Sequence, residues 1–292
     1  MTRIRLPPVS RVAFVADEFP PFCVTASCKQ PADRGAIYVA TGEKFVSEAE
    51  ASLTTLRQSN PSLPVVLLTD SPPARPAVWD EVIVAAELQG QGARAKLHMD
   101  RAPWERCVFL DTDTMVCGNL GAGFALLDRF DFAGEHSHSG HHYEVPGLPA
   151  SFPEINSGVL FWRRNEATKA LFELWRKIYD ADSKKYGGRK WDQKSLRQAV
   201  WESDARFTNL PSSYNLMPYF PAALEGHVVV AHGRSMKNLE RMRDRLNVSG
   251  QLRAYVPGLG TLRHPNEMSC GHIAWTIWRL VAVKMRGLIA RR

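Results

Sequence analysis

Residues 108 to 115, Val-Phe-Leu-Asp-Thr-Asp-Thr-Met, constrain this chain more than any other segment. The apolar run from 108 to 110 predicts a strand buried on both faces of a parallel sheet, and Asp111 and Asp113 follow at its carboxyl end. Open α/β sheets bind ligands at that edge, and neighbouring carboxylates repel each other unless a cation lies between them. Hard oxygen ligands select Mg²⁺ or Mn²⁺, whose coordination shell is usually completed by substrate phosphates. The run therefore predicts a divalent metal holding a phosphorylated substrate, with an ordinary N-cap or a solvated turn as the open alternative.

Length, composition and charge are those of a globular protein. The chain has 292 residues, enough for one large α/β domain or two small ones, and 45% of them are hydrophobic. The formal charge of +7 arises largely in the tail, where five basic residues follow the last acid, Glu267. Because the body is close to neutral and has no basic patch interleaved with aromatic residues, we expect no nucleic-acid partner.

The cysteines and the apolar segments bear on location. Five scattered cysteines without a CxxC pair indicate neither a disulfide framework nor a structural zinc site. The amino terminus has no apolar core of a secretory signal, and no run of 18 apolar residues would span a bilayer. We therefore expect a cytoplasmic enzyme.

Strand and helix patterns alternate from residue 36 onward. Strands are expected near 37–40, 64–69, 81–85, 108–110, 130–134, 158–162 and 228–231, and helices near 93–101, 165–179 and 190–200. Ser47 and Glu50 form a capping box that predicts another helix start, after a loop at 41–45. This order predicts a single α/β, Rossmann-like domain with a mostly parallel central sheet flanked by helices. We expect that domain at 36–262, after an amino-terminal extension at 1–35 and before a basic, partly amphipathic helix at 263–292.

Four further short motifs stand at the ends of these elements. They are Ala93-Arg94-Ala95-Lys96, Asn156-Ser157-Gly158, Asp192-Gln193 and His232-Gly233. With Asp111-Thr112-Asp113, their order resembles the GT-A glycosyltransferases, most closely the family 8 branch that contains galactosyltransferases and glycogenin. The resemblance covers about residues 37 to 237. It implies a GT-A fold and transfer of a sugar from a nucleoside diphosphate.

The resemblance assigns the metal and diphosphate contacts to particular residues. Asp111 and Asp113 would bind Mn²⁺ (or Mg²⁺) and the donor diphosphate, and His232 looks like the third metal ligand, although an isolated histidine is more often structural. A basic residue seventeen positions before the first aspartate commonly contacts the donor, as Arg94 would here, with Lys96 two residues later. Further donor contacts are implied for a last group of residues: Thr112, Gly233 and Lys237.

The remaining site residues would surround the nucleoside and the sugar. The loop from Thr41 to Phe45 should hold the nucleoside, where Phe45 either stacks on uracil or packs against the following helix. Asn156 and Ser157 would hydrogen-bond sugar hydroxyls. Asp192 and Gln193 resemble the family pair near the anomeric carbon, and Asp192 is our first choice for a catalytic or sugar-orienting carboxylate, although it would also serve as an N-cap.

Two segments leave their roles open. The loop 135–142 holds four of the nine histidines, which would allow a zinc site. Because no cysteine or second cluster has ligand spacing, we expect a flexible acceptor-facing loop instead. The tail from 272 to 292 combines tryptophans and aliphatic residues with five basic residues. It would either rest on an anionic membrane, bringing a lipid-linked or surface glycan acceptor to the site, or pack on the domain.

Together these features predict a metal-dependent, retaining glycosyltransferase that uses a nucleotide sugar, most simply a UDP-hexose, and a glycan, lipid-linked or other acceptor. One alternative is a haloacid-dehalogenase-type phosphatase with Asp111 as nucleophile and Asp113 as general acid. A phosphatase of that type would carry the motif after its first strand, and the later Gly-Asp-x-x-x-Asp is absent. Another alternative is a non-catalytic carbohydrate-binding relative.

Overall fold

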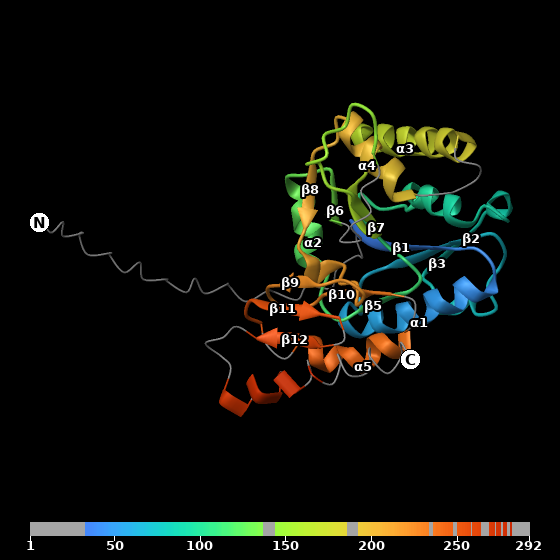
Figure 1. Cartoon of the computed structure of the whole chain (residues 1–292). Helices are drawn as coiled ribbons and strands as arrows, with labels where there is room; N and C mark the ends of the chain where they lie inside the picture. The colour runs from blue at the N-terminus through green and yellow to red at the C-terminus, as the bar shows by residue number, and fades with distance from the viewer. Residues whose placement is uncertain are drawn as a thin grey trace, which may run out of the picture. The chain divides into compact units, whose positions relative to one another are not determined.

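The computed structural model describes residues 33–136, 144–185, 192–233, 236–247, 250–257, 259–263, 269–271, 273–275, 277–278 and 281. Its central sheet has seven strands in the order β3-β2-β1-β4-β7-β6-β8 (Figure 1). The strands are β1 (Arg34–Ala40), β2 (Val65–Thr69), β3 (Glu81–Val84), β4 (Arg106–Leu110), β6 (Phe132–His136), β7 (Ile155–Arg163) and β8 (Phe207–Leu210).

Most neighbours in this sheet are parallel, as the sequence predicts. β7 is the exception, because it runs antiparallel to both β4 and β6. Its start therefore lies beside the end of β4, where Leu110 is opposite Val159 and the Asp111 amide donates to the carbonyl of Gly158 at 2.8 Å. This reversal brings the Asn156-Ser157-Gly158 motif to the same sheet edge as the two aspartates.

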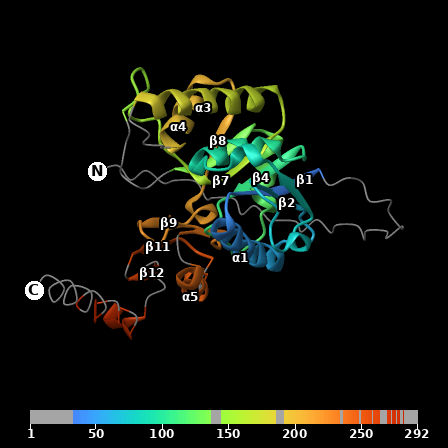
Figure 2. The ribbon, with the colours of Figure 1, turned by 90° about the vertical axis from the view of Figure 1, so that its right-hand side faces the viewer.

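Helices cover both faces of the sheet (Figure 2). Alternate residues of β1 enter different cores, with Ile37 in the cluster that holds Trp175 and Tyr38 in the cluster that holds Leu53. The helices are α1 (Glu43–Ser59), α2 (Gly121–Ala125), α3 (Glu166–Lys185), α4 (Asp192–Glu202) and α5 (Met236–Leu246). Short 3₁₀ helices are η1 (Pro76–Val78), η2 (Ala86–Leu88), η3 (Gly92–Arg101), η4 (Leu126–Asp128) and η5 (Ser212–Tyr214).

The helix after β1 begins earlier than the sequence predicts. α1 starts at Glu43, so Ser47 and Glu50 lie inside it and the predicted capping box is wrong. Gly42 precedes it with φ of 80°, a left-handed conformation that favours glycine, and its amide donates to Asp70 Oδ1 at 3.0 Å. The carboxylate that follows β2 thus fixes the residue before the helix, and Phe45 falls on the first turn of the helix.

A second set of short elements follows the central sheet. β5 (Thr114–Val116) pairs antiparallel with β10 (Val230–His232), which places His232 opposite Thr114. β9 (Ala222–Leu224), β11 (Arg253–Val256) and β12 (Gly260–Arg263) form a small sheet. Met115, Leu224 and Leu239 share a third hydrophobic cluster, which links these elements to α5. The sequence did not predict β5, β8, β9, β11, β12 or α5.

Within the described part of the chain, no helix is long and apolar enough to cross a membrane. Residues 1–32 of the expected extension, 137–142 of the histidine-rich loop and the five basic residues of the tail lie outside the described residues.

Candidate functional site

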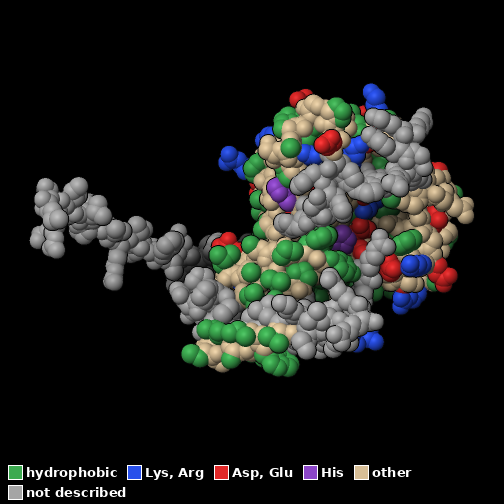
Figure 3. Space-filling model, viewed as in Figure 1, with side chains coloured by type: hydrophobic (Ala, Val, Ile, Leu, Met, Phe, Trp, Pro, Cys, Tyr) green, Lys and Arg blue, Asp and Glu red, His purple; other side chains and the backbone are tan. Residues whose placement is uncertain are grey.

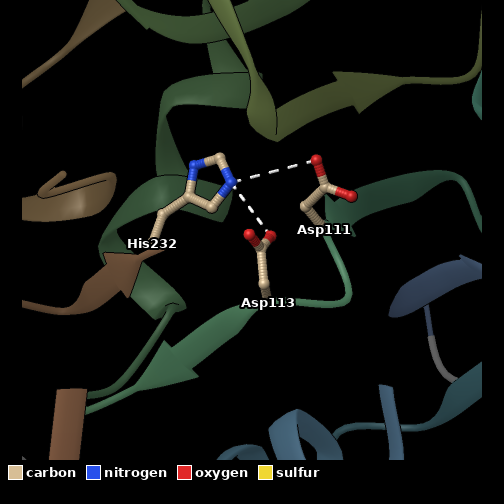
Figure 4. A group of neighbouring side chains, drawn as sticks. All are labelled: Asp111, Asp113 and His232. Carbon is tan, nitrogen blue, oxygen red and sulfur yellow. Dashed lines mark ion pairs between the residues drawn. The ribbon is translucent and has the colours of Figure 1, made fainter. Parts of the chain in front are cut away.

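Asp111, Asp113 and His232 come together at the carboxyl edge of β4 (Figure 4). The two aspartates follow β4, and His232 ends β10, which the pairing with β5 carries to this edge. His232 Nε2 lies 3.1 Å from Asp113 Oδ1 and 3.9 Å from Asp111 Oδ2. One ligand atom from each residue lies within 4.8 Å of the others. Two carboxylates and one imidazole fit Mn²⁺ or Mg²⁺, and they leave positions open for phosphate oxygens.

Electrostatic coupling binds this group together. Burial alone would raise the pKa of Asp113, but the hydrogen bond and the charge of His232 hold it below its usual value. Burial alone would lower the pKa of His232, but the hydrogen bond to Asp113 and the charges of both aspartates raise it above its usual value. The cluster therefore attracts positive charge, as a cation site must.

Lys96 connects the aspartate pair to Asp192. Its Nζ lies 2.8 Å from Asp111 Oδ2 and 3.0 Å from Asp192 Oδ2, and it donates to Ser157 Oγ at 3.3 Å. Ser157 donates in turn to Asp192 Oδ2 at 2.6 Å. Burial opposes the charge of Lys96, but the two facing carboxylates raise its pKa above its usual value. The ammonium group therefore stays charged inside the site, between the two carboxyl groups.

Arg94 takes a different direction. Its guanidinium makes a bidentate ion pair with Asp180 of α3, at 2.7 and 2.8 Å. Arg94 and Lys96 both lie in η3, and in a 3₁₀ helix of three residues per turn two positions i and i+2 are about 240° apart. The same helix therefore directs Lys96 to the carboxylates and Arg94 to α3.

A cavity of about 480 Å³ adjoins the aspartates. Several predicted residues line it together: Thr41, Phe45, Lys96, Asp111, Thr112 and Asp113. Phe45 is 46% exposed, so its ring is available to a planar ligand. Thr112 is buried and its hydroxyl donates to Glu48 Oε2 at 3.3 Å, which joins α1 to the aspartate turn. The loop predicted to hold the nucleoside thus opens on the same cavity as the metal cluster.

Three predicted residues lie around this core. Gln193 follows Asp192 in the first turn of α4 and is partly exposed. Gly233 is buried, and its amide donates to the carbonyl of Asp113 at 3.0 Å, which ties β10 to the aspartate turn. Lys237 is exposed in the first turn of α5, and residues 234 and 235 before it lie outside the described part.

One buried residue of the site has no signal in the sequence. Asn215, at the end of η5, accepts a hydrogen bond from His232 Nδ1 at 2.9 Å and donates to Asn156 Oδ1 at 2.8 Å. Asn156 Oδ1 also accepts from the amide of Gly158 at 2.8 Å. A long-range contact between one turn and two strands cannot be inferred from the composition of any one of them.

Gly158 leaves the space that the ring of His232 occupies. A Cβ at this position would lie 2.2 Å from His232 Cε1. We expect Gly158→Ala to displace the His232 ring. Mn²⁺ binding should then weaken roughly 10- to 100-fold, the usual effect of losing a residue that orients a metal ligand. Gly118→Ala is the matched control, because its Cβ would lie 3.4 Å from the Val229 backbone, an ordinary contact. Equal Mn²⁺ affinities in the two variants, measured by titration, would show that His232 does not bind the ion.

Comparison with known proteins agrees with this geometry. Residues 106–241 match the family model described as nucleotide-diphospho-sugar transferase. The segment begins with β4 and ends in α5, so it contains the aspartate pair, Asp192 and His232. No curated protein matches the chain.

Solved structures share the fold at low sequence identity. The glycosyltransferase GlyE of Streptococcus pneumoniae TIGR4 superposes with a TM-score of 0.52 at 17% identity, over 70% of this chain and 55% of GlyE, so the match spans about half of that protein. Galactosyltransferase LgtC, in complex with donor and acceptor sugar analogs, gives a TM-score of 0.50 at 12% identity, over 74% of this chain and 97% of LgtC. The family match shows that this chain carries a nucleotide-diphospho-sugar transferase domain at residues 106–241, and the likenesses show that the chain has the GT-A fold of these glycosyltransferases.

Proposed function

We propose that this protein is a metal-dependent glycosyltransferase that transfers a hexose from UDP to a glycan or lipid-linked acceptor, with retention of anomeric configuration. The observation that carries the proposal is the Asp111–Asp113–His232 cluster, which opens on the cavity that Thr41 and Phe45 also line. Uridine and retention rest on the resemblance to family 8. Residues 36–262 would form the transferase domain.

The metal group of the site would hold the leaving diphosphate. Asp111, Asp113 and His232 would bind Mn²⁺ or Mg²⁺, which when bound neutralises the charge of the two phosphates. Thr112 and Gly233 lie against this group and would approach the diphosphate through their backbones. Lys237 is proposed for the same end of the donor on the family resemblance alone.

Lys96, rather than Arg94, is our first choice for a basic contact to the donor. Its ammonium group lies between the metal ligand Asp111 and the carboxylate of Asp192, so it would stabilise negative charge on the departing phosphate without reorganisation. Arg94 would reach the donor only by leaving its ion pair with Asp180. We keep Arg94 as the second choice.

The sugar would lie against the start of β7 and of α4. Asn156, Ser157 and Gln193 would donate to or accept from its hydroxyls, and Asp192 would orient it or stabilise positive charge at the anomeric carbon. The hydrogen bond from Ser157 and the charge of Lys96 keep the pKa of Asp192 below its usual value although burial opposes this, so Asp192 is ionised when the donor arrives. Phe45 would stack on the base.

A panel of UDP, GDP and CMP sugars tests this proposal. Each sugar is incubated with Mn²⁺, with Mg²⁺ or with a chelator, and release of the free nucleotide is measured with and without candidate acceptors. We expect release from a UDP sugar that stops in chelator. Full activity in chelator would contradict the metal mechanism. Phosphate release from a simple phosphoester would favour the phosphatase, and donor binding without any turnover would favour a carbohydrate-binding relative.

The carboxyl-terminal segment supports a membrane-bound acceptor. Its described residues Ile273, Trp275, Ile277, Trp278 and Val281 are 44–66% exposed. Figure 3 shows hydrophobic side chains gathered on this segment, which is drawn in red in Figure 1. The five basic residues of the tail would complement an anionic leaflet. We propose that the enzyme binds the cytoplasmic surface of a membrane there; the free cysteines 107, 117 and 270 fit a reducing compartment.

Vesicle sedimentation tests the membrane contact. The full chain should sediment with phosphatidylcholine vesicles that contain an anionic phospholipid, and much less with phosphatidylcholine alone or at high salt. Trp275→Ser should weaken this binding. Trp201→Ser, on α4, is the matched control, because both tryptophans are 46% exposed. Equal sedimentation of both variants and the wild type would favour a tail packed on the domain.

A further inference from the structure

Asn215 occupies the space between the metal group and the sugar-facing end of β7. It follows η5 and is fully buried, with an exposed fraction of 0%. Its side chain contacts His232 on one side and Asn156 on the other, 17 and 59 residues away in the sequence. A buried amide must satisfy its donors and acceptors inside the protein, so the partners of Asn215 show which of its atoms donates and which accepts.

The direction of these hydrogen bonds follows from one backbone amide. The N–H of Gly158 can only donate, so the atom of Asn156 that lies 2.8 Å away must be Oδ1. The atom of Asn215 that lies 2.8 Å from this oxygen must then be the donor Nδ2. The remaining atom of Asn215 is therefore Oδ1, which can only accept.

This chain of donors and acceptors decides the state of the His232 ring. Asn215 Oδ1 lies 2.9 Å from His232 Nδ1, so Nδ1 must carry the proton. This leaves Nε2, which lies 3.1 Å from Asp113 Oδ1, as the nitrogen that would bind a cation; without a cation it donates to Asp113. Histidines that bind metals almost always donate their other N–H to a fixed acceptor, which sets the tautomer and the orientation of the ring.

The main chain holds Asn215 and His232 in this relation. The amide of Leu216, the next residue, donates to the carbonyl of Val230 at 2.9 Å, and the amide of His232 donates to the carbonyl of Leu216 at 2.9 Å. Leu216 is itself buried in the third hydrophobic cluster. The acceptor thus stands on a segment that is locked to the strand bearing the metal ligand.

We propose that Asn215 is a positioning residue that fixes the Nδ1–H tautomer and the orientation of His232, and thereby sets the affinity of the site for a divalent cation. The proposal rests on the metal-binding role of His232 proposed above. Through its hydrogen bond to Asn156, Asn215 also links the metal ligand His232 to a residue that would contact the sugar. Metal binding and the position of the Asn156 side chain therefore both depend on Asn215.

Direct Mn²⁺ binding tests the proposal without turnover. Free Mn²⁺ is measured by electron paramagnetic resonance during titration of the full chain, without donor. Asn215→Leu removes the acceptor at similar size and should weaken binding roughly 10- to 100-fold. Asn215→Asp keeps an oxygen for His232 Nδ1, so its affinity should stay near that of the wild type. A merely structural role would not produce this rescue, and equal affinities of the wild type and Asn215→Leu would overturn the proposal.

Asn60→Leu controls for the loss of a buried amide elsewhere. Asn60 Nδ2 donates to the carbonyl of Gly118 at 3.1 Å, and its Oδ1 accepts from the amide of Leu120 at 2.9 Å. This variant should lower the urea midpoint of unfolding and leave Mn²⁺ affinity unchanged. A loss of Mn²⁺ affinity equal to that of Asn215→Leu would count against a specific role for Asn215.

The tautomer itself is measured on the wild type, so the test does not depend on a variant that folds. Long-range ¹H–¹⁵N correlation spectra of the metal-free protein show whether Nδ1 of His232 is protonated. We expect a proton on Nδ1, whether or not Nε2 also carries one, and an Nδ1 without a proton would overturn the inference. Absence of Mn²⁺ binding in the wild type would instead refute the proposed function, while the spectrum would still show whether Nδ1 is protonated.

Discussion

Replacing Asp113 by asparagine should reduce metal-dependent sugar transfer roughly 1000-fold or more, because the group that holds the leaving diphosphate loses a charged ligand. Asp113 Oδ1 lies 3.1 Å from His232 Nε2, and asparagine has nearly the same shape, so the fold should remain. Asp111→Asn should act in the same way. The measurement is nucleotide release from the donor with Mn²⁺, together with circular dichroism of each variant.

Asp80→Asn provides the control for this prediction. Asp80 stands just before β3 and pairs with Arg57 at 2.6 Å, outside the site. We expect its variant to transfer sugar at a rate close to that of the wild type. Retention of full activity in Asp113→Asn would contradict the metal mechanism, and an equal loss in Asp80→Asn would show that the effect is not specific to the metal site.

The second large effect is expected from Lys96→Met, which keeps the length of the side chain and removes its charge. Asp111 and Asp192 would then face each other without the ammonium group that lies 2.8 and 3.0 Å from them. We expect kcat to fall roughly 100- to 1000-fold, since a preorganised charge at the reacting groups is lost. Mn²⁺ affinity should not fall, because a cation that competes for Asp111 has been removed.

The contrast between turnover and metal affinity identifies the role of Lys96. The matched control is Arg176→Met. Arg176 of α3 forms a similarly half-buried ion pair, at 2.9 Å, with Asp100 near the end of η3, and the variant breaks this pair. This control should change neither quantity by more than a few-fold. If Lys96→Met lost Mn²⁺ affinity and turnover in parallel, Lys96 would be a support of the fold rather than a donor-site residue.

Local patterns in the sequence predicted the elements that carry the site. The apolar run before Asp111, the strand that the Asn156 motif opens and the helix at Asp192 are all confirmed at or near the expected residues. The two strands lie in the central sheet, and the helix packs beside them on β7. The strands of the second set have only three or four residues, too few for a pattern to distinguish them from loops.

The sequence did not predict the directions of the side chains in the site. The spacing to Asp111 favoured Arg94, but the 3₁₀ helix η3 directs Lys96 toward Asp111 and Arg94 toward Asp180. Likewise, the Gly42 conformation and the distant Asp70 carboxylate begin α1 before the predicted capping box. Such outcomes depend on tertiary contacts, which override local preference.

The central claim is that a divalent ion at Asp111, Asp113 and His232 joins the protein to a nucleoside diphosphate. Calorimetric titration of UDP into the full chain, first with Mn²⁺ and then in chelator, tests it most directly. We predict that UDP binds in Mn²⁺, that its affinity falls at least 10-fold in chelator, and that Asp113→Asn removes the difference. Equally tight binding of UDP with and without the metal would contradict the account.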